Sequence, residues 1–97
     1  MIPKKFNILG HTVNVIMDKD LHRLTGNMGE ACKDLNTIRL APSIGIDILP
    51  TSMVEHTYFH EIVHIILDSM NENELSANES FVDMFGGLLY QVLKTSK

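Results

Sequence analysis

Two histidines spaced four residues apart are the side chains in this sequence best suited to chemistry. The sequence reads His60-Glu61-Ile62-Val63-His64. In a helix, residues four apart lie about 40° apart around the axis and one turn from each other, so both imidazoles can reach one ion. Glu61 lies about 60° from His64, near such an ion without having to bind it. We therefore expect zinc bound by His60 and His64, with Glu61 as the general base that takes a proton from water.

The site needs a third protein ligand, because two histidines bind zinc only loosely. A residue on the same helix, such as Asp68, would give poor tetrahedral geometry. Glu79 and Asp83 lie four residues apart in the next predicted helix. Glu79 can therefore face the metal while Asp83 accepts the remaining ring N–H of a ligand histidine. Gly86 continues this stripe and, without a side chain, would allow the two helices to approach closely. We expect one zinc ion per chain, held by the two histidines and Glu79.

The hydrophobic periodicity predicts the elements that position these residues. Apolar residues alternate with polar ones between Lys4 and Met17, around Gly10-His11, which is typical of a β-hairpin. From residue 52 onward the period becomes helical. The fold class that follows is α+β, with a small, mainly antiparallel sheet packed on two antiparallel helices that carry the metal between them. We expect one domain, 1–97, with strands in 1–41 (notably 30–33 and 37–41), a covering loop in 42–51, the active-site helix in 52–70 and the second helix in 71–94.

Possible caps give different starts for the two helices. Residues 52–55 fit a capping box at the start of the first helix. The second helix has an ambiguous start, because Asn71 or Asn73 could cap it. Ser76 could also cap it through a second capping box, in which Glu79 would satisfy backbone amides instead of a metal.

The two motifs together resemble a known family of enzymes. His60-Glu61-x-x-His64 followed by Asn78-Glu79-x-x-x-Asp83 is similar to the gluzincin branch of zinc metallopeptidases, to which thermolysin belongs. The small size resembles minimal zincin domains, including those of phage and mobile-element origin and the ImmA/IrrE type. The resemblance implies that His60, His64 and Glu79 are zinc ligands, that Glu61 is the general base and that Asp83 orients a histidine.

The resemblance also implies two features beyond the metal ligands. Gluzincins use a tyrosine or histidine that hydrogen-bonds the developing oxyanion. Candidates for this oxyanion or substrate contact are His56, one turn before His60, and Tyr58, although the interpretation of His56 as an ordinary surface or helix-packing histidine is favoured. Zincins also bind the substrate backbone as an added strand beside the active-site helix, and we expect 37–41 to be that strand.

Composition excludes several classes of function. The chain has 97 residues, with Lys+Arg 8 against Asp+Glu 12 and a net charge of −4, and it lacks a broad basic cluster. Nucleic acid is therefore an unexpected ligand. A lone Cys32 cannot close an intrachain disulfide, which favours a reducing compartment, and we expect a cytoplasmic protein. The apolar stretches are too short for a signal segment or a membrane span, so we expect no membrane association.

Two functions of different classes follow from these observations. The first is a zinc-dependent metallopeptidase-like protein that hydrolyses peptide bonds in a peptide or protein substrate with a water activated by zinc and Glu61. The second is a zinc-stabilised, non-catalytic binding or regulatory module, such as a phage-type modulator of a host protein. The 14 residues between His64 and Glu79 leave little room for a substrate-binding subdomain, which favours the second function. A metal-free interaction domain is a third alternative.

Overall fold

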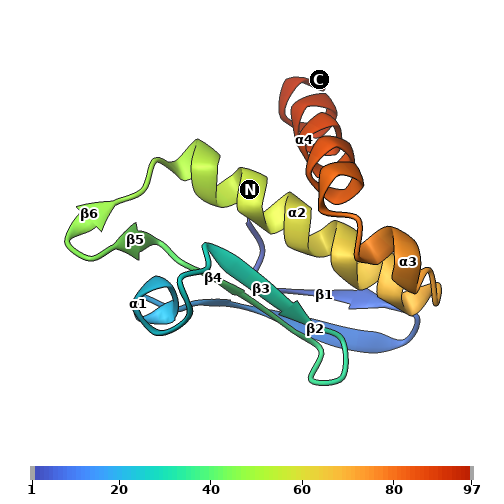
Figure 1. The fold of residues 1–97 in the computed structure, drawn as a ribbon. Helices are drawn as coiled ribbons and strands as arrows, with labels where there is room; N and C mark the ends of the chain where they lie inside the picture. Colours follow the sequence, from blue (N-terminus) through green and yellow to red (C-terminus); the bar gives the residue numbers. More distant parts are fainter. Residues whose placement is uncertain (1, 97) are drawn as a thin grey trace.

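The computed structural model describes residues 2–96 and places a mixed four-stranded sheet at the N-terminal end of the chain (Figure 1). Strands β1 and β2 form the predicted hairpin. Leu9 and Gly10 have φ values of 49° and 78°, as the two central residues of a type I′ turn require. The expected α+β class is confirmed. The strands are β1 (Lys5–Ile8), β2 (His11–Met17), β3 (Gly29–Cys32) and β4 (Thr37–Leu40).

The strand order is β1-β2-β4-β3. The β1–β2 and β3–β4 pairs are antiparallel, whereas β2 and β4 run parallel. The connection between the parallel pair holds the short helix α1 (Leu21–Thr25) and β3. Because β4 is paired along both sides, it has no free backbone edge. The prediction that 37–41 binds a substrate strand is therefore wrong, and β3 is the strand that forms this edge of the sheet.

Helix α2 (Thr51–Ser69) packs one face on the sheet and contains the His-Glu-x-x-His motif. Its first turn has no side-chain cap, since the residue before it is Pro50. The predicted capping box at 52–55 is therefore wrong, and Ser52 lies inside the helix. The main core joins strand residues to the sheet-facing side of α2, and its buried members are Val13, Ile38, Leu40, Val54, Tyr58, Phe59 and Ile65.

The C-terminal part of the chain consists of two helices, α3 (Asn73–Ser76) and α4 (Glu79–Thr95). The long helix begins later than 71 because Asn78 caps it, with its side-chain oxygen accepting from the Phe81 N–H at 3.1 Å. Ser76 lies at the end of α3 and does not cap α4. Glu79 is the first residue of α4, so the alternative in which it completes a capping box is wrong.

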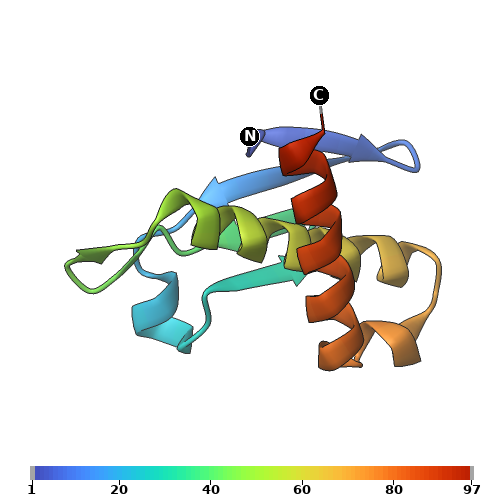
Figure 2. The same ribbon diagram turned by 90° about the horizontal axis from the view of Figure 1, so that it is seen from above.

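Helix α4 crosses α2 steeply in both ribbon views (Figures 1 and 2). The order of contacts still has the predicted antiparallel sense, because Glu79 meets His64 and Lys94 meets Glu55. At the crossing, a Cβ added to Gly86 would lie 3.1 Å from the His60 Cα and 3.2 Å from its N. The expectation that Gly86 permits close approach of the helices is confirmed.

The segment predicted as a covering loop forms a small hairpin, β5 (Ser43–Ile44) and β6 (Asp47–Ile48), which projects from one end of the fold (Figure 1). Its tip residue, Ile46, is 97% exposed, so the segment does not cover the core. Within residues 2–96 no helix has the length and apolar character needed to cross a membrane.

An ion pair between a buried carboxylate and a half-exposed ammonium group joins the two long helices. The Glu55 carboxylate is buried, and one of its oxygens accepts from the Lys94 ammonium at 2.9 Å and from the Tyr90 hydroxyl at 2.8 Å. The hydrogen bond from Lys94, and then that from Tyr90, hold the pKa of Glu55 below its usual value. Removing either partner would leave a buried carboxylate with less compensation.

Replacing Gly86 with alanine tests the helix crossing. In an exposed helix this change stabilises by about 1 kcal/mol. The clash with the His60 backbone should outweigh this gain and lower the free energy of unfolding by about 1–2 kcal/mol. This change lowers Tm by roughly 4–15 °C. Ser80→Ala, at an exposed position of the same helix, is the matched control and should leave Tm nearly unchanged. An increase in Tm for Gly86→Ala would contradict the close crossing.

The Glu55 ion pair predicts how stability depends on pH. The pKa of Glu55 in the folded protein lies below the unfolded value of 4.5. The stabilisation that the ion pair gives to the fold is therefore present above about pH 5 and is lost as pH falls through the folded-state pKa of Glu55. Glu55→Gln should therefore lower Tm by several degrees at pH 7, with the gap to the unmodified protein closing below pH 4.5. Thermal melts of both proteins without added zinc measure this gap. A gap that stays constant down to acidic pH would contradict the ion pair.

Candidate metal centre

The side chains that the sequence assigned to chemistry line one open pocket of about 420 Å³. The pocket lies between β3, α2 and the first turns of α4. His60, Glu61 and His64 come from α2, and Glu79 and Asp83 come from α4. The pocket is also lined by Asn27, Met28, Gly29, His56 and Thr57.

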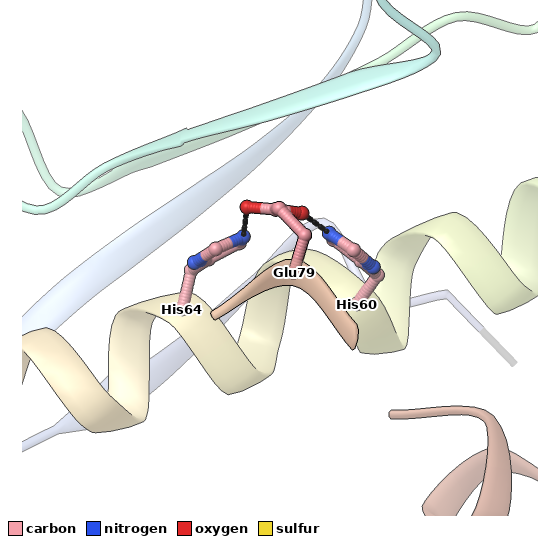
Figure 3. A group of neighbouring side chains, drawn as sticks. All are labelled: His60, His64 and Glu79. Atoms are coloured by element: carbon pink, nitrogen blue, oxygen red, sulfur yellow. Dashed lines mark hydrogen bonds and ion pairs between the residues drawn. The ribbon is translucent and has the colours of Figure 1, made fainter. Parts of the chain in front are cut away.

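The three predicted ligands converge on one point (Figure 3). The Glu79 carboxylate lies between the two imidazoles, with Oε2 3.1 Å from His60 Nε2 and Oε1 3.3 Å from His64 Nε2. One donor atom of each residue lies within 4.8 Å of the other two. A tetrahedral zinc ion with bonds of about 2.0–2.1 Å separates its ligand atoms by about 3.4 Å. The donor types and their spacing therefore fit zinc.

The first turn of α4 places Glu79 at this point. Because Asn78 caps the helix, the Glu79 side chain is not needed for the backbone amides and extends toward α2. Its negative charge also lies at the N-terminal end of the helix, where the helix dipole favours an anion. The Glu79 carboxylate is 68% exposed, so it stays reachable from solvent.

Each of the two candidate ligand histidines has a second partner at Nδ1. His60 Nδ1 lies 3.4 Å from Asp83 Oδ1, and His64 Nδ1 lies 3.0 Å from Ser76 Oγ. A proton on each Nδ1 would be donated to these oxygens, which leaves each Nε2 lone pair free for a metal. The contact predicted between Asp83 and a ligand histidine is present. Sequence reasoning missed Ser76, because the short helix that brings this buried hydroxyl under His64 was not predicted.

Glu61 lies beside the ligand group and outside it. Its side chain is 7% exposed, and burial raises its pKa to about 7; the electrostatic effect of His60 opposes this rise, and Glu79 and Glu30 add to it. A carboxylate with a pKa near neutrality can both accept and release a proton at physiological pH. This position and this pKa are suited to the predicted role of general base.

Strand β3 passes very close to the face of α2 that lines the pocket. A Cβ added to Gly29 would lie 2.5 Å from Thr57 Cγ2 and 3.3 Å from the Glu61 carboxylate. Gly29 therefore lets the strand run directly along the pocket. Sequence reasoning did not single out Gly29, because the strand pattern carries no sign of which strand meets the helix.

The outer edge of β3 has free backbone groups. The Ala41 N–H donates to the Met28 carbonyl, and antiparallel pairs exchange hydrogen bonds at every second residue. Residues 28, 30 and 32 therefore pair with β4. The N–H and C=O groups of Gly29 and Ala31 point away from the sheet, along the pocket, where an extended peptide could pair with them.

The two candidates for an oxyanion or substrate contact have different positions. Tyr58 is 4% exposed and packs edge-on against Phe6 and Phe59, and burial raises its pKa to about 12. Residues two apart in a helix point about 160° from each other, so Tyr58 faces the sheet when His60 faces the pocket. The candidate role for Tyr58 is therefore wrong.

His56 does line the pocket. Its ring stacks on Tyr90, and its Nε2 is buried, 3.9 Å from Asp83 Oδ1, with no hydrogen-bond partner in the described part of the chain. Of the two candidates, only His56 lies at the pocket, and its Nε2 is not exposed to it.

Comparisons of the chain with protein-family models, with curated proteins and with solved structures gave no match. The assignment of a function therefore depends on the geometry of the site.

Ser76→Ala tests whether the hydroxyl positions His64 for metal binding. Loss of an outer partner of a ligand histidine typically weakens metal affinity by about 10–100-fold, and we expect zinc affinity to fall by about tenfold in a competition titration with a chelating dye. Ser80→Ala, which removes an exposed hydroxyl, should leave affinity unchanged. Equal affinity in the Ser76→Ala variant would show that the hydroxyl has no part in the site.

Proposed function

We propose that this protein is a zinc-dependent, metallopeptidase-like hydrolase that cleaves a peptide bond in an extended peptide or protein segment. The observation that carries the proposal is the convergence of His60, His64 and Glu79 at metal-ligand spacing, with the buried Glu61 carboxylate beside them. The free edge of β3 along the same pocket supports an extended substrate.

The three convergent residues would hold the ion through two imidazole nitrogens and one carboxylate oxygen. A bound zinc ion would supply a Lewis acid and lower the pKa of a water molecule in the pocket toward neutrality. Asp83 and Ser76 keep the imidazoles oriented through their Nδ1 atoms. Orientation by fixed partners reduces the reorganisation that the ligands need when the ion binds.

In this proposal, strand β3 orients the substrate. The outward backbone groups of Gly29 and Ala31 can each pair with an extended segment, which then lies along α2 with its backbone beside Glu61. Because β-strand addition uses main-chain hydrogen bonds, it tolerates many side chains. The proposal therefore predicts a requirement for an extended conformation more than for a particular sequence.

Glu61 moves the proton in this reaction. Its carboxylate takes a proton from the water as the water oxygen bonds to the carbonyl carbon of the peptide. Glu61 then gives that proton to the amine nitrogen as the C–N bond breaks. The Glu61 carboxylate packs against Gly29, which limits its contact with bulk water.

A zinc-stabilised binding module without turnover is the second candidate. The observation that favours it concerns His56, whose Nε2 is buried against Gly87, so that an added Cβ there would lie 3.1 Å from this atom. A buried Nε2 cannot donate to a substrate oxyanion. In this alternative the β3 edge still binds an extended segment but releases it uncut.

Glu61→Gln separates the two candidates. The amide cannot accept the proton, so cleavage of an unstructured protein such as denatured casein should fall by about 10²–10⁴-fold, while the zinc content stays at one ion per chain. Mass spectrometry of fragments and elemental analysis measure the two quantities. Glu72→Gln, at an exposed position, is the matched control and should retain both.

The remaining outcomes are equally decisive. Undiminished cleavage by Glu61→Gln would refute the mechanism. One zinc ion per chain without cleavage by the unmodified protein would favour the binding module, and absence of zinc would contradict both candidates. Glu79→Ala should lose zinc in either case, because it removes the carboxylate between the two imidazoles.

A further inference from the structure

Helix α4 has an exposed apolar face on the side away from the pocket. We call Phe81, Phe85, Leu88 and Val92 the α4 stripe. Their spacing of four, three and four residues is the spacing of the contact positions in paired helices. Phe85 is 49% exposed, Leu88 55% and Val92 59%, and the neighbouring Met84 is 65% exposed. Phe81 and Phe85 stack on each other with ring centroids 5.7 Å apart.

Phe85, Leu88 and Val92 lie away from the face that binds α2, whereas Phe81 is partly buried and packs against the cluster of Val63, Leu67 and Val82. Glu79, Asp83 and Gly86 face α2, and the stripe lies roughly 160–200° around the helix from Glu79 and Asp83. In both ribbon views α4 lies on the outer side of α2, away from the sheet (Figures 1 and 2). The residues that border the stripe on its outer side are Ser80, Met84, Gln91 and Thr95, so in the described chain this whole face of α4 lacks a charged residue.

The size of this face decides what can cover it. Its exposed apolar side chains present roughly 500 Å², which is near the upper end for the largest apolar patch on a monomer. Two such faces packed together would bury about 1,000 Å² before their polar borders are counted. That total reaches the lower limit for a specific protein interface. A dimer through this face would have an interface at the small end of this range, so we expect it to be weak and dependent on concentration.

The order of side chains along the α4 stripe favours a second copy of the same chain. The stripe is aromatic at its start and aliphatic at its end. An antiparallel pairing about a two-fold axis between positions 85 and 88 sets Phe81 opposite Val92, and Phe85 opposite Leu88, in both halves of the interface. Each large ring then meets a smaller side chain, and the two helix dipoles run in opposite directions, which is favourable.

We propose that the α4 stripe is a homodimer interface in which α4 packs antiparallel on α4 of a second copy. An uncharged face suits an identical uncharged face, because neither copy buries an unpaired charge on association. The proposal is independent of the zinc site, since the pocket lies on the other side of α4 and stays open in the dimer.

Sedimentation equilibrium of the full chain tests the interface. We expect a mass of twice 10.9 kDa to be approached over a range of about 1–100 μM. Leu88→Glu places a charge beside the two-fold axis and should weaken dimerisation at least tenfold. Val92→Glu does the same from the end of the stripe, in case one variant fails to fold as judged by circular dichroism. Ile46→Glu, on the β5–β6 hairpin, is the matched control and should remain dimeric.

Three results would overturn the proposal. The first is a monomer over the whole concentration range, which would indicate that the face binds a helix of an unlike partner. The second is a folded Leu88→Glu or Val92→Glu variant that dimerises normally. The third is loss of the dimer in Ile46→Glu, which would place the interface on the hairpin.

Disulfide cross-linking tests the orientation of the pair. In a Cys32→Ser background, Phe81→Cys and Val92→Cys chains should cross-link when mixed and oxidised. Neither should cross-link alone, because antiparallel pairing separates the two copies of each position by about 16 Å along the axis. Cross-linking of Phe81→Cys with itself would indicate parallel helices and overturn the proposed arrangement.

Discussion

The close crossing of α4 over α2 at Gly86 is the contact on which the rest of the site depends. With no side chain at Gly86, the helix backbones approach so closely that an added Cβ would lie 3.1 Å from the His60 Cα. This spacing brings the first turn of α4 over His60 and His64, so that a short glutamate side chain reaches both imidazoles. A larger residue at the crossing would lift α4 and move the carboxylate of Glu79 away from the ligand nitrogens.

Two further contacts hold this crossing at its ends. At one end, the buried Ser76 hydroxyl contacts His64, which connects the turn before α4 to the pocket-lining face of α2. At the other end, Lys94 and Tyr90 bind the buried carboxylate of Glu55. The angle of α4 is therefore set on both sides of Gly86. A site assembled from two elements needs such fixed geometry, because small displacements of a ligand strongly reduce its contribution.

The same crossing gives α4 two faces with different surroundings. One face supplies Glu79 and Asp83 to the pocket, and the opposite face leaves the α4 stripe exposed. The edge of β3 is the third surface, and Gly29 brings it next to Glu61. In a chain this small, the proposed roles are placed on opposite sides of one helix and on one edge of the sheet, because little buried volume is left to form a dedicated substrate-binding subdomain.

The sequence by itself determined the local features. These are the first hairpin, the long helix with both histidines on one side, the helix face that carries Glu79 and Asp83, and the need for a small residue at Gly86. Each follows from the period of a helix or strand, which acts over a few residues. Only the tertiary structure decided that β3 instead of β4 forms the free edge, that Tyr58 faces the core and that Ser76 supports His64. These depend on strand order and on the packing of distant segments, which local periodicity does not encode.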